Sequence, residues 1–455
     1  MIHSTGLNIH VEQGQQNLLA LHQSNPTRYP FLLESVADPS DKNAAQFDIL
    51  FAFPQETLTL SKQGNLSSNS DIVEKEIKDN DFLDSLSHWW DSKQNNKINC
   101  DSLPFSGGWF LYLGYELAQQ IEPHLKITLP NTAIAYATRI PSAVIYSHKE
   151  DCTYYLCEKE FDYIEQLKID ASQVLTLQKN KNTAVGIIEE DENQYLNSIK
   201  KIKKYIVDGD VFQVNLSRRW SIENSHIDAC SLYQKLRETN PAPFSGLAVY
   251  NDFSIISSSP ERLISVKNNI AETRPIAGTR RREEDKVKDE ALKAELIAHP
   301  KERAEHIMLI DLERNDLGRI CKPGSIKVDE LMVLESYAHV HHIVSNVCGT
   351  LQDNILPGDV IKAVFPGGTI TGCPKVRCME IISELETEAR GAYTGSMGYL
   401  NHNGDMDLNI LIRTMSLENN SLSFRAGAGL VTDSVAQSEL EETRHKARGL
   451  LLALE

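Results

Sequence analysis

The stretch FPGGTITGCPKVRCMEII, residues 365–382, joins a glycine-rich turn to a helical pattern. Closely spaced glycines let backbone N–H groups approach an anion without a Cβ in the way. A helix that begins near Pro374 adds the positive end of its dipole at the same place. The pattern fits an anion site or a plain tight turn. It does not match the nucleotide fingerprints GxGxxG or GxxxxGK[ST].

Two carboxylate pairs lie on either side of this stretch. HPKERAEHIMLIDLERNDLGR (299–319) places Glu302 and Glu305 on one helical turn. SVAQSELEETRHKARG (434–449) does the same with Glu439 and Glu442, and Lys446 follows one turn later. Mg²⁺ prefers hard oxygen ligands and is often held by one or two carboxylates with waters and an anionic ligand. Each pair taken alone also fits a solvated helix face that forms i,i+4 ion pairs.

Several side chains are candidates for acid, base or anion-clamp work. They are Glu261 in SSSPERL, Tyr393 in GAYTG, Arg413 in ILIRT, and His339, His341 and His342 in YAHVHHIVS. An arginine after an apolar run is costly to bury without a partner, and its planar fork matches a carboxylate at two points. Arg413 is therefore the best carboxylate clamp. A histidine is more often structural than catalytic, so the cluster alone decides little.

The rest of the chain reads as a mixture of strands and long helices. β-Branched and aromatic residues predict strands at 46–54 and 132–148, and the polar stretch 61–101 predicts exposed helix and loop. A polar patch at 171–191 precedes a helix at 192–207 and suggests a boundary. Strands at 254–258 and 421–426 then alternate with helices at 285–312 and 374–388. The pattern predicts an α/β or α+β domain.

Composition limits the partners. The 455 residues carry a formal net charge of −17 and are 41% hydrophobic, which suits a large core. No basic, aromatic surface for nucleic acid stands out, and no apolar run is long enough to span a membrane. The N-terminus lacks the plan of a signal peptide, so we expect a cytoplasmic protein. None of the eight cysteines forms a CxxC pair, so we expect reduced thiols.

Eight motifs together resemble the chorismate-utilising enzymes, which include anthranilate, aminodeoxychorismate, isochorismate and salicylate synthases. The motifs are GDVFQVNLSRR (209–219), SSSPERL (257–263), RPIAGTRR (274–281), HPKERAEHIMLIDLERNDLGR (299–319), YAHVHHIVSNV (337–347), FPGGTITGCPKVRCMEII (365–382), MDLNILIRT (406–414) and RAGAGLVTDSVAQSELEETRHKA (425–447). The resemblance implies an α+β fold of two stacked antiparallel sheets flanked by helices. Residues 1–170 would be woven into the same fold as a catalytic domain at 190–455.

The resemblance also implies residue roles. Glu302, Glu305, Glu439 and Glu442 look like the magnesium shell. The residues that resemble the enolpyruvyl-carboxylate site are Tyr393, Arg413, Gly427, Gly429 and Lys446. Thr369 would approach the ring, and His342 would lie near it. Glu261 resembles the general acid that protonates the departing 4-hydroxyl, which otherwise leaves too slowly at neutral pH.

Two positions, Gln213 and Ala277, help to decide which chorismate-utilising enzyme the chain resembles most. Water-using relatives have a lysine base where this chain has Gln213, and a neutral amide cannot take that proton, so ammonia is favoured over water. The turn PGGTITGCPK, GSMGYL, FDILFAFP and the chain length resemble the aminodeoxychorismate synthases, which aminate C4. Ala277 in RPIAGT opposes this assignment, because that group commonly carries a nucleophilic lysine there and anthranilate synthases carry alanine. A noncatalytic, tryptophan-binding homologue is the remaining alternative.

The same resemblance suggests two partners. No glutaminase motif is present, so we expect a separate glutaminase subunit that supplies ammonia. The stretch YPFLLESVADPS (29–40) resembles the LLES element that binds tryptophan in this family, through Leu33, Glu34 and Ser35. An ordinary buried strand is the alternative there.

Overall fold

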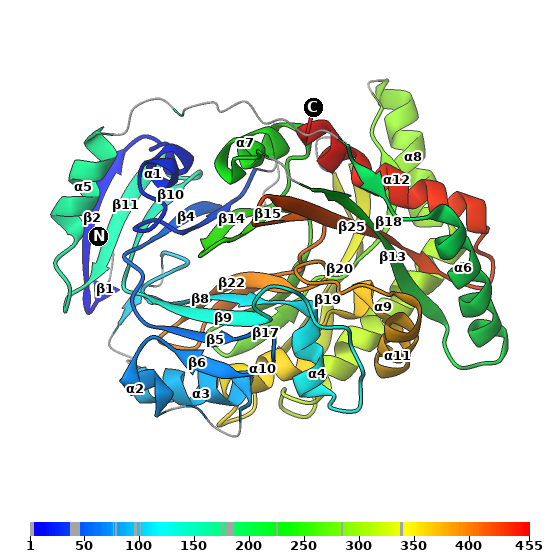
Figure 1. Ribbon diagram of the computed structural model, residues 1–455, viewed down its shortest axis with the longest axis horizontal. Coiled ribbons are helices and arrows are strands. Elements are labelled where there is room, and N and C mark those ends of the chain that lie inside the picture. Colours follow the sequence, from blue (N-terminus) through cyan, green and yellow to red (C-terminus); the bar gives the residue numbers. More distant parts are fainter. Residues whose placement is uncertain are drawn as a thin grey trace.

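Two stacked antiparallel sheets with helices on their outer faces form the molecule (Figure 1). This is seen in a computed structural model that describes residues 4–36, 46–75, 77, 80–94, 98–100, 102–173, 177, 186–223, 226–283, 285–336 and 340–455. The architecture confirms the expected α+β class.

The first sheet has 12 strands and is the upper layer in Figure 1. Its order is β12 (Ile188–Glu189), β13 (Gln213–Ile222), β25 (Ser421–Leu430), β24 (Thr414–Glu418), β15 (Phe253–Ser259), β14 (Phe244–Tyr250), β3 (Phe31–Glu34), β4 (Phe47–Ala52), β10 (Ser142–Ser147), β11 (Cys152–Glu158) and β2 (Leu7–Gln13), with β21 (Gly372–Cys373) beside β13. The expected strands at 254–258 and 421–426 are β15 and part of β25.

The second sheet has 11 strands and is the lower layer. Its order is β18 (Ile276–Arg281), β20 (Val340–Thr350), β17 (Ile270–Thr273), β16 (Arg262–Lys267), β23 (Met406–Asn409), β22 (Ser396–Asn401), β8 (Gly108–Leu113), β9 (Ala135–Ile140), β5 (Thr57–Leu60) and β6 (Leu66–Ser68), with β19 (Lys327–Ser336) beside β20. A short pair, β1 (Ser4–Thr5) and β7 (Asn99–Cys100), stands apart.

Helices cover both outer faces. Those against the first sheet are α1 (Leu18–Ser24), α5 (Ile164–Gln173), α6 (Glu192–Val207), α7 (Ala229–Thr239) and α12 (Ala436–Ala453). Those against the second are α2 (Asp71–Glu74), α3 (Phe82–Lys93), α4 (Ala118–Ile121), α8 (Lys286–Ala298), α9 (Pro300–Gly318) and α10 (Pro357–Val364). α11 (Lys375–Leu385) packs on β13, and two 3₁₀ turns, η1 (Tyr115–Leu117) and η2 (Gly368–Ile370), complete the chain.

An aromatic core lies between the sheets. Phe31 of β3 and Phe110 of β8 stack with ring centroids 4.0 Å apart, and Phe51 of β4 contacts Phe110 edge-on at 5.5 Å. Each ring comes from an early strand, and these strands pair with later ones, β3 with β14 and β8 with β22. Strands from 1–170 and from 190–455 therefore share both sheets and one core, so neither range packs alone.

Two helix predictions need correction. The helix expected over 285–312 is two helices, because the backbone of His299 is extended before Pro300, and α9 begins there. The stretch 61–101 is less exposed than its composition suggested, because α3 buries Trp89 and Trp90 on the second sheet. Its charged residues stay at the surface, while Ser85 and Ser87 are buried with the apolar face.

Other expectations concern chemistry and boundaries. All eight cysteines are free thiols, which agrees with the sequence analysis. Within the described residues, no helix combines the length and apolar character needed to cross a membrane. Most of the proposed boundary at 171–191 and all of His339 lie outside the described residues.

Candidate functional site

One end of the molecule, on the right of Figure 1, brings the two carboxylate pairs together from α9 and α12. Burial raises the pKa of Glu305, Lys301 opposes this, and the charges of Glu302, Glu439 and Glu442 raise it further. Burial likewise raises the pKa of Glu439, with Glu442 adding to the effect. The four carboxylates therefore face one another closely enough to repel.

The cluster of Glu302, Glu305, Glu439 and Glu442, called the acidic cluster below, is the candidate magnesium site. In the part of the chain that the structure describes, no three acidic, histidine or cysteine side chains lie close enough to form a metal cage. Arg280 instead binds Glu302 at 3.2 Å, and Lys446 binds Glu442 at 2.8 Å. The donor set is all carboxylate, and its mutual repulsion would be relieved by a cation. It fits an ion such as Mg²⁺ that keeps waters and needs only one or two protein carboxylates.

A glycine-lined surface on β13 and β25 adjoins the acidic cluster, because Lys446 binds both Glu442 and the carbonyl of Gly427. Gly429 pairs with Asn215, and Gly427 pairs with Ser217. A Cβ on Gly429 would lie 2.3 Å from Nε2 of Gln213, and one on Gly427 would lie 2.6 Å from the hydroxyl of Tyr393. The glycines are therefore required so that these polar side chains can lie against the strand.

Two of the expected carboxylate-binding side chains meet at Gly427. Lys446 donates from Nζ to the carbonyl of Gly427 at 3.0 Å, and the Tyr393 hydroxyl lies beside the same residue. Burial raises the pKa of Tyr393 to about 12, so its hydroxyl remains a donor at neutral pH. A cation and a neutral donor thus flank one glycine of the strand, which suits an anion.

Glu261 follows β15 and is 6% exposed. Burial raises its pKa to about 7, although Thr369, the backbone of Ile276 and the charge of Lys446 act in the opposite direction. Its Oε1 atom is buried and has no hydrogen-bond partner among the described residues. Glu261 is therefore a carboxyl group that keeps its proton near neutral pH and has a free position for a ligand.

The glycine turn of 365–375 carries Thr369 on η2. The Thr369 hydroxyl is buried beside the Glu261 carboxyl group, and the Thr369 carbonyl accepts from Nδ2 of Asn215 at 3.1 Å. Oε1 of Gln213 and Oδ1 of Asn215 lack partners among the described residues. Buried polar atoms in native proteins are nearly always paired, so several orphans in one place indicate a site for water or ligand.

His342 and Arg413 form the far side of this region. Nδ1 of His342 lies 3.0 Å from the Thr279 hydroxyl. Burial, and then the nearby charge of Arg413, lower the pKa of His342 to about 4, so it is neutral. Arg413 has a backbone φ of 50°, and burial lowers its pKa. No hydrogen bond or ion pair joins its guanidinium to a described residue.

The other expected positions have structural surroundings. His341 is buried between Ser336 and Asp289, at 2.8 Å from each, and lies in the sheet interior. Ala277 is buried in β18 opposite Ile343, next to a bulge at Gly278, which has a φ of 66°. The side chain at position 277 therefore offers no nucleophile.

Sequence reasoning missed Arg390, which holds the site together. Its guanidinium donates to Glu386 at 2.7 Å, to the carbonyl of Asn215 at 2.8 Å and to the carbonyl of Ile370 at 3.3 Å. It also lies 5.5 Å from the ring centroid of Tyr393. Most of these partners are main-chain atoms distant in sequence, so no local motif could reveal the contact.

Glu313 of α9 was also missed. It is 7% exposed, and its pKa is raised to about 8 by burial and by Asp316, with Lys375 opposing and Glu261 adding to the rise. A Cβ on Gly368 would lie 3.5 Å from Oε1 of Glu313, so the carboxyl group lies against the turn that carries Thr369. A second protonated carboxyl group thus stands behind Glu261.

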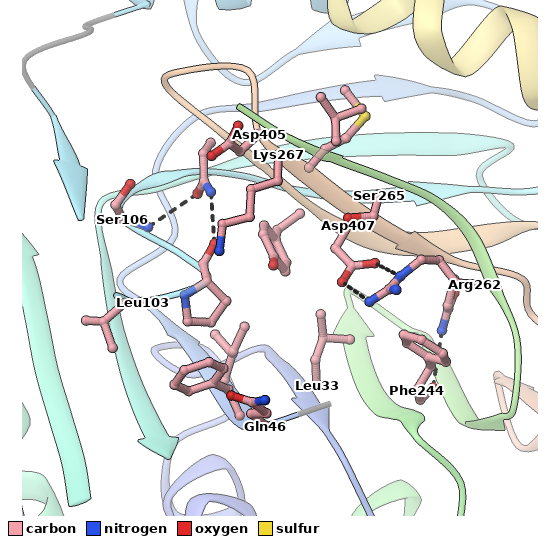
Figure 2. A pocket seen from close by; sticks show the side chains of 18 of the residues that line it. Leu33, Gln46, Leu103, Ser106, Phe244, Arg262, Ser265, Lys267, Asp405 and Asp407 are labelled. Atoms are coloured by element: carbon pink, nitrogen blue, oxygen red, sulfur yellow. Dashed lines mark hydrogen bonds and ion pairs between the residues drawn. The ribbon is translucent and has the colours of Figure 1, made fainter. Parts of the chain in front are cut away.

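A separate cavity of about 390 Å³ lies between the sheets at the C-terminal end of β3 (Figure 2). Leu33 and Glu34 line it, whereas Ser35 does not; the backbone N–H of Ser35 binds Asp48 at 2.9 Å. Figure 2 shows Arg262 and Asp407 paired on one side, with Phe244 beside them. Glu34 is not free, because Tyr233 and Arg237 bind its carboxylate at 2.7 and 2.8 Å.

Comparison with known proteins gives consistent matches. A family described as chorismate binding enzyme matches residues 31–452. Aminodeoxychorismate synthase component 1 of Bacillus subtilis (strain 168) is 42% identical over 81% of this chain and 81% of its own. An anthranilate synthase component I-like protein of Synechocystis sp. is 43% identical over 78% of this chain and 74% of its own.

A solved structure shares the fold. Anthranilate synthase component I from Streptococcus pneumoniae TIGR4 superposes with a TM-score of 0.78 at 33% identity, over 90% of this chain and 93% of that one. The relatives thus bear two different names at similar identity.

Proposed function

Because the chain belongs to the family of chorismate binding enzymes, we propose that it aminates chorismate at C4, as component I of an aminodeoxychorismate synthase. Its product would feed 4-aminobenzoate and folate synthesis. Glu261 is the main support for this proposal. Burial raises the pKa of this carboxyl group to about 7, and its Oε1 atom has no partner among the described residues. Expulsion of a ring hydroxyl needs such a donor.

The surrounding residues have distinct roles in this proposal. Glu261 protonates the 4-hydroxyl so that it departs as water. Arg413, Tyr393 and Lys446 bind the enolpyruvyl carboxylate, with Gly427 and Gly429 leaving room for it. Thr369 and the neutral His342 lie along the ring. The support is the unpartnered guanidinium of Arg413 and the glycine contacts described above.

We further propose that Glu302, Glu305, Glu439 and Glu442 hold Mg²⁺ together with waters and the ring carboxylate of the substrate. When bound, the ion would neutralise that carboxylate and orient the ring. Support comes from the converging, mutually repelling carboxylates of α9 and α12.

Ammonia is the proposed nucleophile, and a separate glutaminase subunit is its proposed source. Gln213 occupies the position of the base in water-using relatives, and its amide cannot accept a proton from water. Ammonia needs no such base once it arrives unprotonated. The name of the Bacillus subtilis relative, aminodeoxychorismate synthase component 1, supports the presence of a second subunit.

Anthranilate synthesis is the second candidate. Ala277 favours it, because an alanine offers no nucleophile for covalent attack at C2, and the Streptococcus pneumoniae structure is an anthranilate synthase component I. The glycine turn and the Bacillus subtilis relative favour C4. A noncatalytic homologue is disfavoured by the retained acid, clamp and carboxylate cluster.

Product identification separates these candidates. We expect purified protein given chorismate, Mg²⁺ and ammonium at mildly alkaline pH to yield 4-aminobenzoate only after an aminodeoxychorismate lyase is added. The products are separated and identified by mass and fluorescence. Anthranilate formed without the lyase would reverse the assignment, and failure to consume chorismate would indicate the noncatalytic alternative.

Glu261→Gln should lower kcat by about 10²–10⁴-fold, because the amide cannot donate the proton, while chorismate still binds. In the wild type at a fixed concentration of neutral ammonia, kcat/KM should fall ~10-fold per pH unit above about pH 7, as Glu261 ionises. Glu418→Gln, on the distant strand β24, is the matched control. A rate that Glu261→Gln leaves unchanged would remove Glu261 from the acid role.

Mg²⁺ should stabilise the protein. Occupancy at 100 times Kd adds about 2.7 kcal/mol to the free energy of unfolding, which thermal unfolding with and without Mg²⁺ measures. Glu305→Gln should raise the midpoint without metal, since it removes repulsion from three carboxylates, and should abolish most of the Mg²⁺ shift. An equal Mg²⁺ shift in Glu305→Gln and wild type would place the ion elsewhere.

We propose that the cavity beside β3 binds tryptophan. It is lined by Leu33 and Phe244, and the guanidinium of Arg262 lies 5.0 Å from the Phe244 ring. Phe244→Ala should weaken tryptophan binding about tenfold in calorimetry, because it removes an aromatic wall. Glu261→Gln, which leaves the cavity intact, should bind tryptophan normally. Absence of heat with the wild type would leave the β3 stretch as an ordinary buried strand.

A further inference from the structure

Two carboxamide side chains project from the same face of β13. Gln213 and Asn215 are two residues apart on one strand, so their side chains point the same way. Both face the glycines of β25: Nε2 of Gln213 lies against Gly429, and Oδ1 of Asn215 would lie 2.9 Å from a Cβ on Gly427. We name Gln213 and Asn215 the amide pair.

The donor of Asn215 is fixed, and the acceptor oxygens of both amides are free. Nδ2 of Asn215 donates to the carbonyl of Thr369 at 3.1 Å, which sets the orientation of that amide. Oδ1 of Asn215 and Oε1 of Gln213 are both buried, and neither has a partner among the described residues. A buried acceptor left without a donor is destabilising, so the position favours a ligand that donates hydrogen bonds.

The identity of that donor follows from charge. Carboxylates of a substrate are acceptors and cannot satisfy amide oxygens. A cation is disfavoured, because Nζ of Lys446 lies 3.0 Å from the Gly427 carbonyl on the facing strand. A small neutral molecule with several N–H or O–H donors meets both conditions, and the proposed amination selects ammonia among these.

We propose that the amide pair binds neutral ammonia and aims it at the substrate ring, an inference that rests on the proposed amination. Two N–H groups of ammonia would donate to Oε1 of Gln213 and Oδ1 of Asn215, which leaves the lone pair free to attack. Neither amide can remove a proton, so the nucleophile must enter unprotonated. Thr369 connects the pair to the acid, since its carbonyl binds Asn215 and its side chain lies beside Glu261.

The chemical balance of the step is complete. The nitrogen lone pair forms the C–N bond, and the C–O bond of the ring hydroxyl breaks with its electrons on oxygen. That oxygen takes the Glu261 proton and leaves as water. The new C–NH₃⁺ group returns one proton to the Glu261 carboxylate, so that chorismate and ammonia give the aminated product and water.

The test varies ammonia at saturating chorismate. Asn215→Leu and Gln213→Met keep the side-chain size but remove the acceptors, and each should raise the KM for ammonia tenfold or more. The KM for chorismate should stay within twofold of the wild-type value. Asn197→Leu, at an exposed site of α6, is the matched control and should change neither constant.

A pH series supplies the second readout. The wild-type KM, expressed as neutral ammonia, should be constant from pH 7.5 to about 9; a KM constant only when expressed as ammonium would overturn the site. If the wild type forms the aminated product but both variants keep the wild-type KM for ammonia, the ammonia site alone is overturned. The same holds if the variants raise only the KM for chorismate. A wild-type protein that forms no aminated product overturns the proposed function and the ammonia site together.

Discussion

The fork of hydrogen bonds around Arg390 is the constraint on which the site depends. A planar guanidinium presents five donors in fixed directions, and here all five are used: two by Glu386, and the others by Asn215, Ile370 and Thr394. Each of these last three partners lies in or next to a site element: Asn215 in β13, Ile370 beside Thr369, Thr394 beside Tyr393. One buried side chain thereby fixes three segments far apart in sequence, and lysine could not replace it.

Charge balance around this fork explains why it can be buried. Glu386 also binds Arg425 at 3.3 Å, and although its burial opposes ionisation, Arg390 and Arg425 keep its pKa low. Two arginines share one carboxylate, so the base of the site stays positive. On the other side, burial raises the pKa of Glu261 to about 7 and that of Glu313 to about 8, so both can hold a proton near neutral pH. In the buried interior, the paired arginines stay charged where an anion would bind, and the carboxyl groups can keep protons where a leaving group needs one.

The sequence predicted features that depend on local patterns. The helix at 192–207 was placed at its observed ends, because its apolar residues recur at helical spacing and Asp191 caps it. The carboxylate pairs followed from i,i+3 spacing. Features that depend on distant contacts were missed: Arg390 binds main-chain oxygens, and the cavity draws Leu33, Phe244 and Asp407 from three strands. Ser35 was expected beside Leu33 and Glu34 but does not line the cavity, and its backbone N–H binds Asp48.

The cavity and the acid meet at one corner of the chain. Glu261 lies between β15 and β16, and Arg262 is the first residue of β16. Glu261 faces Thr369, while Arg262 lines the cavity and binds Asp407 at 2.8 Å. The carbonyl of Glu261 accepts from Ile410 at 3.0 Å, three residues along from Asp407. The strand that anchors Arg262 therefore also anchors Glu261. Coupling between two sites requires a shared element whose arrangement both ligands bias, and this corner touches both among the described residues.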